Sequence, residues 1–167
     1  MLTPVQRRSR RARKATFVIV ASEYNRRYVD SMVRAATAVL RRAGGVARVV
    51  RVPGAYEIPL VASRIARLHR EGAGGSPPAP AGFAIICLGV ILRGETVHAA
   101  HIGEAVSSAL MRIQLRYEVP LIHEVLLLEN HAQAKVRCLD RRHNRGAEAA
   151  QTALAMAAVL ASVDGSP

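Results

Sequence analysis

Short apolar runs alternate along the chain with longer segments in which apolar residues recur every three or four positions. The run TFVIVA at 16–21 is rich in β-branched residues and too short for a helix, so it predicts a buried strand. The segment 27–43 predicts a helix that ends at Gly44 and Gly45. Its apolar face comprises Val29, Met32, Val33, Ala36, Val39 and Leu40. A strand followed by an amphipathic helix is thus the first unit of the expected fold.

The same alternation continues through the rest of the chain. Further strands are predicted at 46–52, 83–88 and 121–128. Further helices are predicted at 58–70, 99–117, 132–138 and 146–161, and Leu60, Ile65 and Leu68 would face the core from the first of these. The Pro/Gly-rich stretch 71–82 predicts a surface loop. Strands that alternate with helices need crossover connections, so we expect an α/β fold, a three-layer sandwich with a four-stranded parallel sheet.

Length and composition fit one globular domain. With 167 residues, half of them hydrophobic, we expect a domain at 15–162 between tails at 1–14 and 163–167. No run approaches the ~20 apolar residues that cross a bilayer, so no membrane association is expected. Cys87 and Cys138 have neither CxxC nor paired spacing. A disulfide framework or zinc knuckle is therefore not indicated, and the cytoplasm is the expected compartment.

The positive charge is concentrated at the N-terminus. The chain carries a net charge of +12, and residues 1–14 contribute six basic side chains without an acid. Such an arm can bind nucleic acid, act as an organellar transit peptide or remain a solvated tail. The chain has four Tyr, two Phe and no Trp, which offers few platforms for stacking bases. We therefore favour a solvated, flexible tail over nucleic-acid binding.

Unusual residues follow each predicted strand. In a parallel sheet, ligands bind at the carboxyl ends of the strands. There the chain has S-E-Y-N at 22–25, P-G-A-Y-E at 53–57, the segment 89–98, and Glu129 with Asn130. This edge of the sheet is the expected site.

The segment 89–98 has the chemistry to hold a phosphate. Gly89 and Gly94 have the G-x-x-x-x-G spacing of a P-loop, but Glu95 and Thr96 follow where a nucleoside triphosphatase needs Lys and Ser or Thr. What remains is a glycine turn before a helix, where backbone N–H groups can hold one phosphate and Thr96 adds a hydroxyl. A plain strand–helix turn with Thr96 as the N-cap is the alternative.

The histidines after that turn suggest proton transfer rather than metal binding. A neutral imidazole at His98, where the helix begins, could exchange protons with a substrate near neutral pH. His101 follows at i+3, whereas a zinc pair normally uses i+4, so a metal site is weakly supported. For any single histidine, a surface or packing role is the ordinary alternative.

The motif P-G-A-Y-E-I-P at 53–59 predicts a rigid turn with free donors. Its two prolines fix φ and remove donors, and Gly54 would allow an unusual backbone angle. Exposed N–H groups and the Glu57 carboxylate suit a polyol or an amide edge. The alternative is a structural turn with Glu57 as an acid in the first helical turn.

Together these motifs resemble a known enzyme family. S-E-Y-N, P-G-A-Y-E-I-P, L-G-V-I-L-R-G-E-T-V-H at 88–98 and N-R-G-A-E-A-A at 144–150 are similar, in this order, to lumazine synthases over about 16–160. The resemblance implies a flavodoxin-like fold and a transferase of riboflavin biosynthesis. It would condense 5-amino-6-(D-ribitylamino)uracil with 3,4-dihydroxy-2-butanone 4-phosphate to 6,7-dimethyl-8-ribityllumazine, releasing phosphate and water without cofactor or metal.

The resemblance also assigns residues to the pyrimidine. Tyr24 would stack on the ring and Asn25 would flank it. The backbone at Ile91 and Leu92 would contact the pyrimidine edge. His123, from the adjacent subunit, would cover the ring.

The ribityl chain and the proton transfers are assigned in the same way. Ala55, Tyr56 and Glu57 would hold the ribityl chain, with Glu57 accepting hydroxyl protons. His98 would be the proton shuttle that assists Schiff-base formation and phosphate elimination.

The phosphate would lie between two subunits. The resemblance places Gly94, Glu95 and Thr96 in the cradle and gives Arg137, from the adjacent chain, as the clamping arginine. Arg145 matches a basic position nearby. A helix N-terminus and a guanidinium would then meet a dianion.

Glu95 and the pair His123 and Glu124 depart from the family pattern, as does the segment 127–130, which is unlike the usual Thr-rich turn. Glu95 stands where many members have a small residue, so we expect only its N–H to face the phosphate. His123 and Glu124 replace an aromatic–glycine pair, which we place at the end of the fourth strand.

The resemblance implies a homo-oligomer, either a pentamer or a sixty-subunit icosahedral capsid, and allows an association with riboflavin synthase. Two other functions stay open at this point. One is a lumazine- or flavin-binding relative with little or no catalysis, and the other is a shell whose basic arm holds nucleic acid.

Overall fold

The structure, a computed structural model, describes residues 15–72 and 82–164. The expected N-terminal tail, most of the loop at 71–82 and the last three residues lie outside the described part. The elements in chain order are β1 (Thr16–Ser22), α1 (Arg26–Arg42), β2 (Val46–Val52), the 3-10 turn η1 (Ala55–Glu57), α2 (Ile58–Glu71), β3 (Phe83–Leu92), α3 (His98–Tyr117), β4 (Leu121–Leu128), α4 (His131–Ala134), the π-helical turn η3 (Lys135–Leu139) and α5 (Arg145–Val163).

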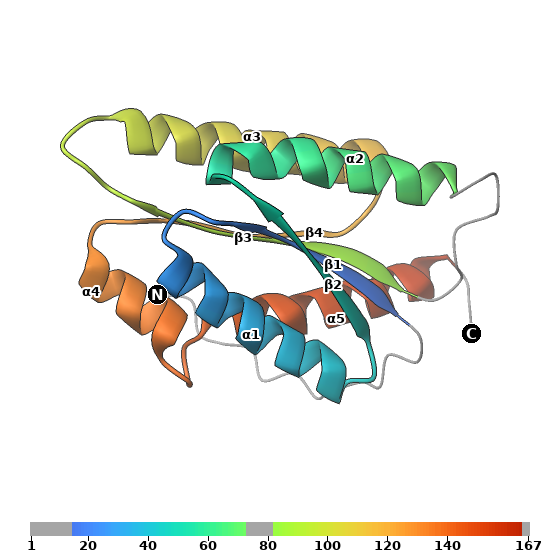
Figure 1. The fold of residues 1–167 in the computed structure, drawn as a ribbon. Coiled ribbons are helices and arrows are strands. Elements are labelled where there is room, and N and C mark those ends of the chain that lie inside the picture. The colour runs from blue at the N-terminus through green and yellow to red at the C-terminus, as the bar shows by residue number, and fades with distance from the viewer. Residues whose placement is uncertain (1–14, 73–81, 165–167) are drawn as a thin grey trace.

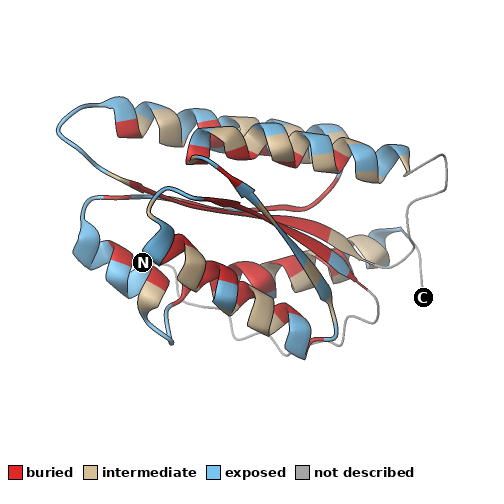
Figure 2. Ribbon diagram, in the orientation of Figure 1, coloured by how far each residue is buried: buried red, intermediate tan, exposed pale blue. Residues whose placement is uncertain are grey.

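The expected α/β sandwich is confirmed. The four strands form one sheet in the order β2-β1-β3-β4, and all three neighbouring pairs are parallel. Helices α2 and α3 cover one face of the sheet, and α1, α4 and α5 lie on the other (Figure 1). In Figure 2, β1, β3 and most of β4 are buried, whereas the edge strand β2 and the outer faces of the helices are largely exposed.

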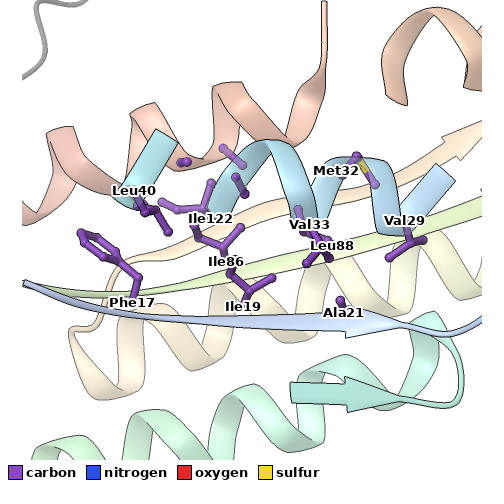
Figure 3. Close-up of a cluster of buried hydrophobic side chains, with 14 of the residues drawn as sticks. Phe17, Ile19, Ala21, Val29, Met32, Val33, Leu40, Ile86, Leu88 and Ile122 are labelled. Atoms are coloured by element: carbon purple, nitrogen blue, oxygen red, sulfur yellow. The ribbon is translucent and has the colours of Figure 1, made fainter. Parts of the chain in front are cut away.

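Alternation along the strands builds a core on each face of the sheet. Phe17, Ile19 and Ala21 of β1 point to the side of α1 and α5, where they meet Met32 and Leu40 (Figure 3). Val18 and Val20 point to the opposite core, beneath α2 and α3. A strand that is buried on both faces is a continuous apolar run, which is why TFVIVA predicted β1 correctly.

Helix α2 turns a different face to the sheet from the one expected. Its buried residues are Ile58, Ala62 and Ala66, and Leu60 and Leu68 are 75% and 46% exposed, so the prediction that they face the core is wrong. Small alanines at i and i+4 let the helix lie close to the sheet. The close packing that they allow stabilises this orientation more than burial of the larger leucine side chains would. Ile65, the third expected residue, is partly buried against the core.

Strand β3 is longer than its apolar run suggested. It ends at Leu92 instead of residue 88, and Gly89 pairs with Val125 inside the sheet. The loop before α3 is therefore 93–97, and Gly89 is not part of a phosphate-binding turn. His123 and Glu124 also lie near the beginning of β4, not at its end.

Helix α5 is apolar enough to resemble a membrane span. Among the described residues, it is the one helix whose length and mean hydropathy of 1.3 pass that test. One face of α5 is buried as part of the core, through Ala149, Ala150, Ala153 and Ala157.

We predict that Gly146→Ala destabilises the fold. A Cβ at Gly146 would overlap the backbone of Met32 in α1, which cannot yield as a flexible side chain can. The loss in free energy of unfolding should be about 1–3 kcal/mol or more, measured by chemical denaturation. Gly103→Ala on α3 is the matched control, since its Cβ would have ordinary contacts at 3.7 Å. Equal stability of the two variants would contradict this packing.

Candidate functional site

The loops after β1, β2 and β3 meet at the carboxyl edge of the sheet (Figure 1). The Glu23 N–H donates to the Val52 carbonyl at 2.8 Å, and the Tyr24 N–H donates to the Pro53 carbonyl at 3.2 Å. The Asn25 side-chain amide donates to the Val90 carbonyl of β3 at 2.8 Å. The segment S-E-Y-N is thus bound to the strands on both sides of β1.

The residue type at position 25 follows from this geometry. Asn25 has φ 54° and ψ 38°, a left-handed conformation that Asn tolerates better than most residues. Its amide also supplies the donor that reaches β3. Neighbouring Tyr24 is left 74% exposed, with its ring free to cover a ligand.

Glu57 and Tyr24 converge over Gly54. A Cβ at Gly54 would lie 2.8 Å from Glu57 Oε2 and 3.9 Å from Tyr24 Cδ2. Gly54 has φ −136° and ψ 177°, an extended conformation, so the expected unusual backbone angle is wrong and the glycine provides space instead. Tyr56 is 63% exposed, and Ala55 is buried beneath the turn. Glu57 is the N-cap residue of α2, where its side chain makes no capping hydrogen bond, and the first turn of α2 contains no acid.

The turn from β3 to α3 leaves backbone donors accessible. Gly94, Glu95 and Thr96 are exposed, and a Cβ at Gly94 would have no heavy atom within 4 Å. The N-cap of α3 is Val97 rather than Thr96, and no side chain caps the helix there. Thr96 Oγ1 accepts a hydrogen bond of 3.4 Å from the His98 N–H. The positive end of a 20-residue helix is therefore open at this turn.

Two residues that the sequence did not single out for this turn hold it at its base. The Arg93 N–H donates to the Leu128 carbonyl at 2.8 Å, and Arg93 Nη1 lies 2.9 Å from Glu129 Oε1. The available signal was that Arg93 and Glu129 follow the carboxyl ends of adjacent strands. Of the pyrimidine-edge residues, Ile91 is 8% exposed and Leu92 is partly buried, both inside β3.

His123 is bound within its own subunit on the α3 side of β4. Ser107 Oγ donates to the Gly103 carbonyl at 2.8 Å, so it accepts the bond of 2.8 Å from His123 Nε2. The Val125 N–H donates to His123 Nδ1 at 3.3 Å. These partners fix the neutral tautomer, and packing against β4 and α3 lowers the pKa of His123. A groove lined by Ala100, Gly103, Glu104, Ser107, Val125 and Leu127 lies beside it.

Arg137 and Arg145 belong to the other face of the sheet. Arg137 is exposed in η3. Arg145 begins α5, where both Glu124 and Glu148 bind its guanidinium. Burial raises the pKa of Glu124, while the Arg145 charge opposes that shift. Within the described part of the chain, no hydrogen bond or ion pair joins His123, Arg137 or Arg145 to the loops after β1, β2 and β3.

The described residues offer no preformed metal centre. Within 15–72 and 82–164, no three His, Cys, Asp or Glu side chains gather closely enough to hold a metal ion. Both cysteines are free and buried.

The chain is similar to known proteins over most of its length. The family model for 6,7-dimethyl-8-ribityllumazine synthase matches residues 14–161. The chain belongs to this family. A 6,7-dimethyl-8-ribityllumazine synthase of Stenotrophomonas maltophilia is 37% identical over 150 residues, covering 87% of this chain and 89% of that protein. Synthases of the same name from Xylella fastidiosa (36% over 149 residues, covering 87% and 90%) and Xanthomonas campestris (38% over 143 residues, covering 84% and 86%) are similar as well.

Membership of the lumazine synthase family confirms the resemblance drawn from the four motifs. It does not by itself assign a role to any residue. The geometry divides the assigned residues into two groups, one at the carboxyl edge and one on β4, η3 and α5.

We predict that His123 makes stability depend on pH. Because its pKa is lowered in the folded chain, the unfolded chain binds the proton more readily. Stability should therefore fall as the pH drops below about 6.5. His123→Gln keeps a donor for Ser107 and removes this titration. In thermal melts between pH 7.5 and 5, the melting temperature of the variant should fall less steeply with decreasing pH than that of the wild type. The difference should begin at about pH 6.5.

His69 contributes part of the pH dependence of stability that remains in this variant, because burial against Phe83 also lowers the pKa of His69. An unchanged pH dependence in His123→Gln would contradict the neutral, hydrogen-bonded state of His123.

Proposed function

We propose that this chain catalyses the family reaction, the condensation of 5-amino-6-(D-ribitylamino)uracil with 3,4-dihydroxy-2-butanone 4-phosphate. The observation that carries the proposal is the convergence of an exposed tyrosine ring, a carboxylate and an uncapped helix N-terminus at one edge of the sheet. These groups suit a ring, a polyol and a phosphate respectively.

The pyrimidine substrate lies on Tyr24 and is oriented by its sugar chain. Tyr24 provides an exposed ring above Gly54, with Asn25 beside it and the backbone of β3 at Ile91 and Leu92 along the ring edge. Ribityl hydroxyls donate to the Glu57 carboxylate, which faces the same space, and contact the turn at Ala55 and Tyr56.

The phosphorylated ketone lies at the turn before α3. Backbone N–H groups at Gly94, Glu95 and Thr96 meet the phosphate, and the α3 dipole adds to their attraction. Glu95 is exposed, and only its backbone N–H is taken to face the phosphate in this proposal.

The reaction needs orientation more than a strong acid or base. The pyrimidine amine attacks the ketone carbonyl, and water leaves to give the Schiff base. Elimination then releases phosphate and leaves an enol that becomes a carbonyl, and the ribitylamino nitrogen attacks this carbonyl and expels a second water as the ring closes. His98, one turn from the phosphate cradle, transfers protons in these steps. Holding two reactants in register can lower the barrier by up to ~7–11 kcal/mol, so a modest set of acid–base groups suffices.

A neighbouring subunit completes the site. Leu60 and Leu68 on α2 and Met111 and Leu115 on α3 expose large apolar side chains, and β2 and β4 are open sheet edges. Such surfaces favour assembly. We infer a homo-oligomer, a pentamer or an icosahedral capsid of pentamers, in which His123 and Arg137 reach the loops of the next subunit. Arg137 then clamps the phosphate opposite the α3 N-terminus.

The cytoplasm is the compartment we propose, in keeping with two free, buried cysteines. The association with riboflavin synthase stays a prediction.

The direct test is incubation of the full chain with both substrates while lumazine fluorescence is followed. We expect turnover without added metal or cofactor. Tight binding of the lumazine without any turnover would overturn the catalytic proposal and indicate a binding relative.

Single variants should separate the roles of His98 and Arg137. His98→Ala should lower kcat by about 10²-fold or more, because it removes the proton-transfer group. Arg137→Ala should chiefly raise KM for the phosphorylated ketone, because it removes a phosphate contact. Steady-state kinetics with each substrate varied in turn measures both effects. Unchanged kcat and KM in both variants would contradict the assignment.

Mixing these two variants tests the shared site. If the cradle and the arginine come from neighbouring subunits, reassembly of a 1:1 mixture creates about one quarter of sites with both native residues. With the ketone well below the raised KM of Arg137→Ala, where each variant alone has little activity, fluorescence assays should then detect recovered activity near that fraction of wild type. A mixture no more active than the mean of its components would show that each site lies within one chain.

A further inference from the structure

The net positive charge of the folded chain lies on α1 and β2. The described residues hold eighteen of the 24 basic side chains and all twelve acids, and the other six basic side chains lie at 1–14. Residues 26–52 contain seven arginines and a single acid, Asp30, whereas the other described residues contain eleven basic and eleven acidic side chains. The excess of six positive charges therefore belongs to one helix and to the edge strand beside it.

Five of these arginines form a stripe along the outer face of α1. Arg27, Arg34 and Arg41 are seven residues apart, which is close to two helical turns, so their side chains leave the helix in nearly the same direction. Arg26 and Arg42 flank this line at the two ends of the helix, and all five arginines are exposed. At about 1.5 Å per residue, this α1 arginine stripe extends over about 24 Å.

Most of the stripe has no counter-charge within the subunit. Asp30 lies 3.4 Å from a guanidinium nitrogen of Arg26 and 2.5 Å from one of Arg51, so its charge is already matched. Within 15–72 and 82–164, no side-chain hydrogen bond or ion pair involves Arg27, Arg34, Arg41 or Arg42. A surface that gathers charges of one sign attracts a partner of the opposite sign.

The chemistry of the stripe favours a phosphodiester backbone as this partner. A guanidinium binds phosphate oxygens through two parallel N–H groups. The apolar side chains of α1, among them Tyr28, Met32 and Leu40, are buried, and none of the large apolar side chains exposed on the described residues belongs to α1. The helix thus has no side chain to insert into a lipid surface, no ring for an unstacked base and no apolar anchor for a protein partner.

A second copy of this chain does not fit the stripe either. Two stripes would repel each other, and the described residues outside 26–52 carry no acidic excess that could complement one. The exposed leucines that favour assembly, Leu60, Leu68 and Leu115, lie on α2 and α3, across the sheet from α1 (Figure 1). Assembly through those leucines leaves the stripe accessible.

We propose that the α1 arginine stripe binds nucleic acid through the phosphate backbone, without reading the base sequence. Arginines about 10 Å apart along a helix reach separate phosphates of a double strand, so several contacts form together. The inference does not depend on the proposed function, because none of the five arginines belongs to the proposed catalytic site. It also differs from nucleic-acid binding by the N-terminal arm, because the stripe is a fixed array on a folded helix.

The test measures binding of the full chain to fluorescein-labelled DNA and RNA duplexes of about 20 base pairs, by fluorescence anisotropy at about 50–200 mM salt. The stripe variant combines Arg34→Gln, Arg41→Gln and Arg42→Gln. Each phosphate contact contributes about 0.9 to the slope of log K against log salt concentration, so this slope should become shallower by about 2.7. The affinity at about 50 mM salt should fall by about tenfold or more. Loss of binding to either duplex supports the proposal, and the duplex that binds the wild type more tightly identifies the partner.

Two charge-matched variants test whether the position of the arginines matters. The first removes three exposed arginines from α2 and α3, through Arg64→Gln, Arg112→Gln and Arg116→Gln, and should bind the duplexes as tightly as the wild type. The second removes the same charge from the N-terminal arm, through Arg7→Gln, Arg8→Gln and Arg10→Gln, and should lose less affinity than the stripe variant. The stripe variant should keep the melting temperature of the wild type, because its three changed side chains are exposed and bind no other side chain of the described residues.

The proposal is overturned if the wild-type chain binds neither duplex at about 50 mM salt. Equal weakening in the stripe variant and the α2–α3 variant would overturn it as well, because net charge alone would then explain the binding. A larger loss in the arm variant would assign the binding to residues 1–14 instead. Binding to vesicles that contain phosphatidylserine, but to neither duplex, would indicate a lipid surface and also contradict the proposal. None of these results affects the proposed function, which lumazine turnover tests separately.

Discussion

The hydrogen bond from the Asn25 amide to the Val90 carbonyl joins the loop after β1 to β3. It spans the place where the chain changes direction across the sheet, since β2 lies on one side of β1 and β3 on the other. In open parallel sheets a crevice forms at this switch point, outside the carboxyl ends of the strands. The bond ties the loop after β1 to β3, and the neighbouring Tyr24 stays exposed. The proposed ring platform depends on that placement.

In the proposed function, one subunit supplies only part of the site. The carboxyl edge has a ring, a carboxylate and backbone donors, but the arginine proposed to clamp the phosphate lies on η3, on the opposite face of the sheet from α3 (Figure 1). His123 is bound to Ser107, away from Tyr24. Exposed leucines on α2 and two open sheet edges give the chain surfaces that another copy can cover. Assembly and catalysis are then one requirement, because a lone subunit would bind the phosphate weakly.

The sequence predicted the fold well where burial on both faces leaves a continuous apolar run, as in β1 and the first half of β3. It failed where packing depends on a partner: nothing local shows that Ala62 and Ala66, rather than Leu60 and Leu68, approach the sheet. The position of the site loops could be predicted, because they follow the carboxyl ends of the predicted parallel strands. His98 begins α3, as predicted. The pairing of Glu124 with Arg145 could not be foreseen, because 21 residues separate them and the packing of α5 against β4 brings them together. The prediction for Gly54 failed in the same way. The glycine leaves room for the Glu57 carboxylate and the Tyr24 ring, and its φ angle is an ordinary extended one.

The central claim is that two subunits build each site, one with the turn at Gly94 and the other with Arg137. A structure of the assembled protein with bound inorganic phosphate tests it most directly. The account predicts phosphate between the backbone N–H groups at 94–96 of one subunit and the Arg137 guanidinium of its neighbour. An assembly in which Arg137 lies far from Gly94 in every pair of touching subunits would contradict it.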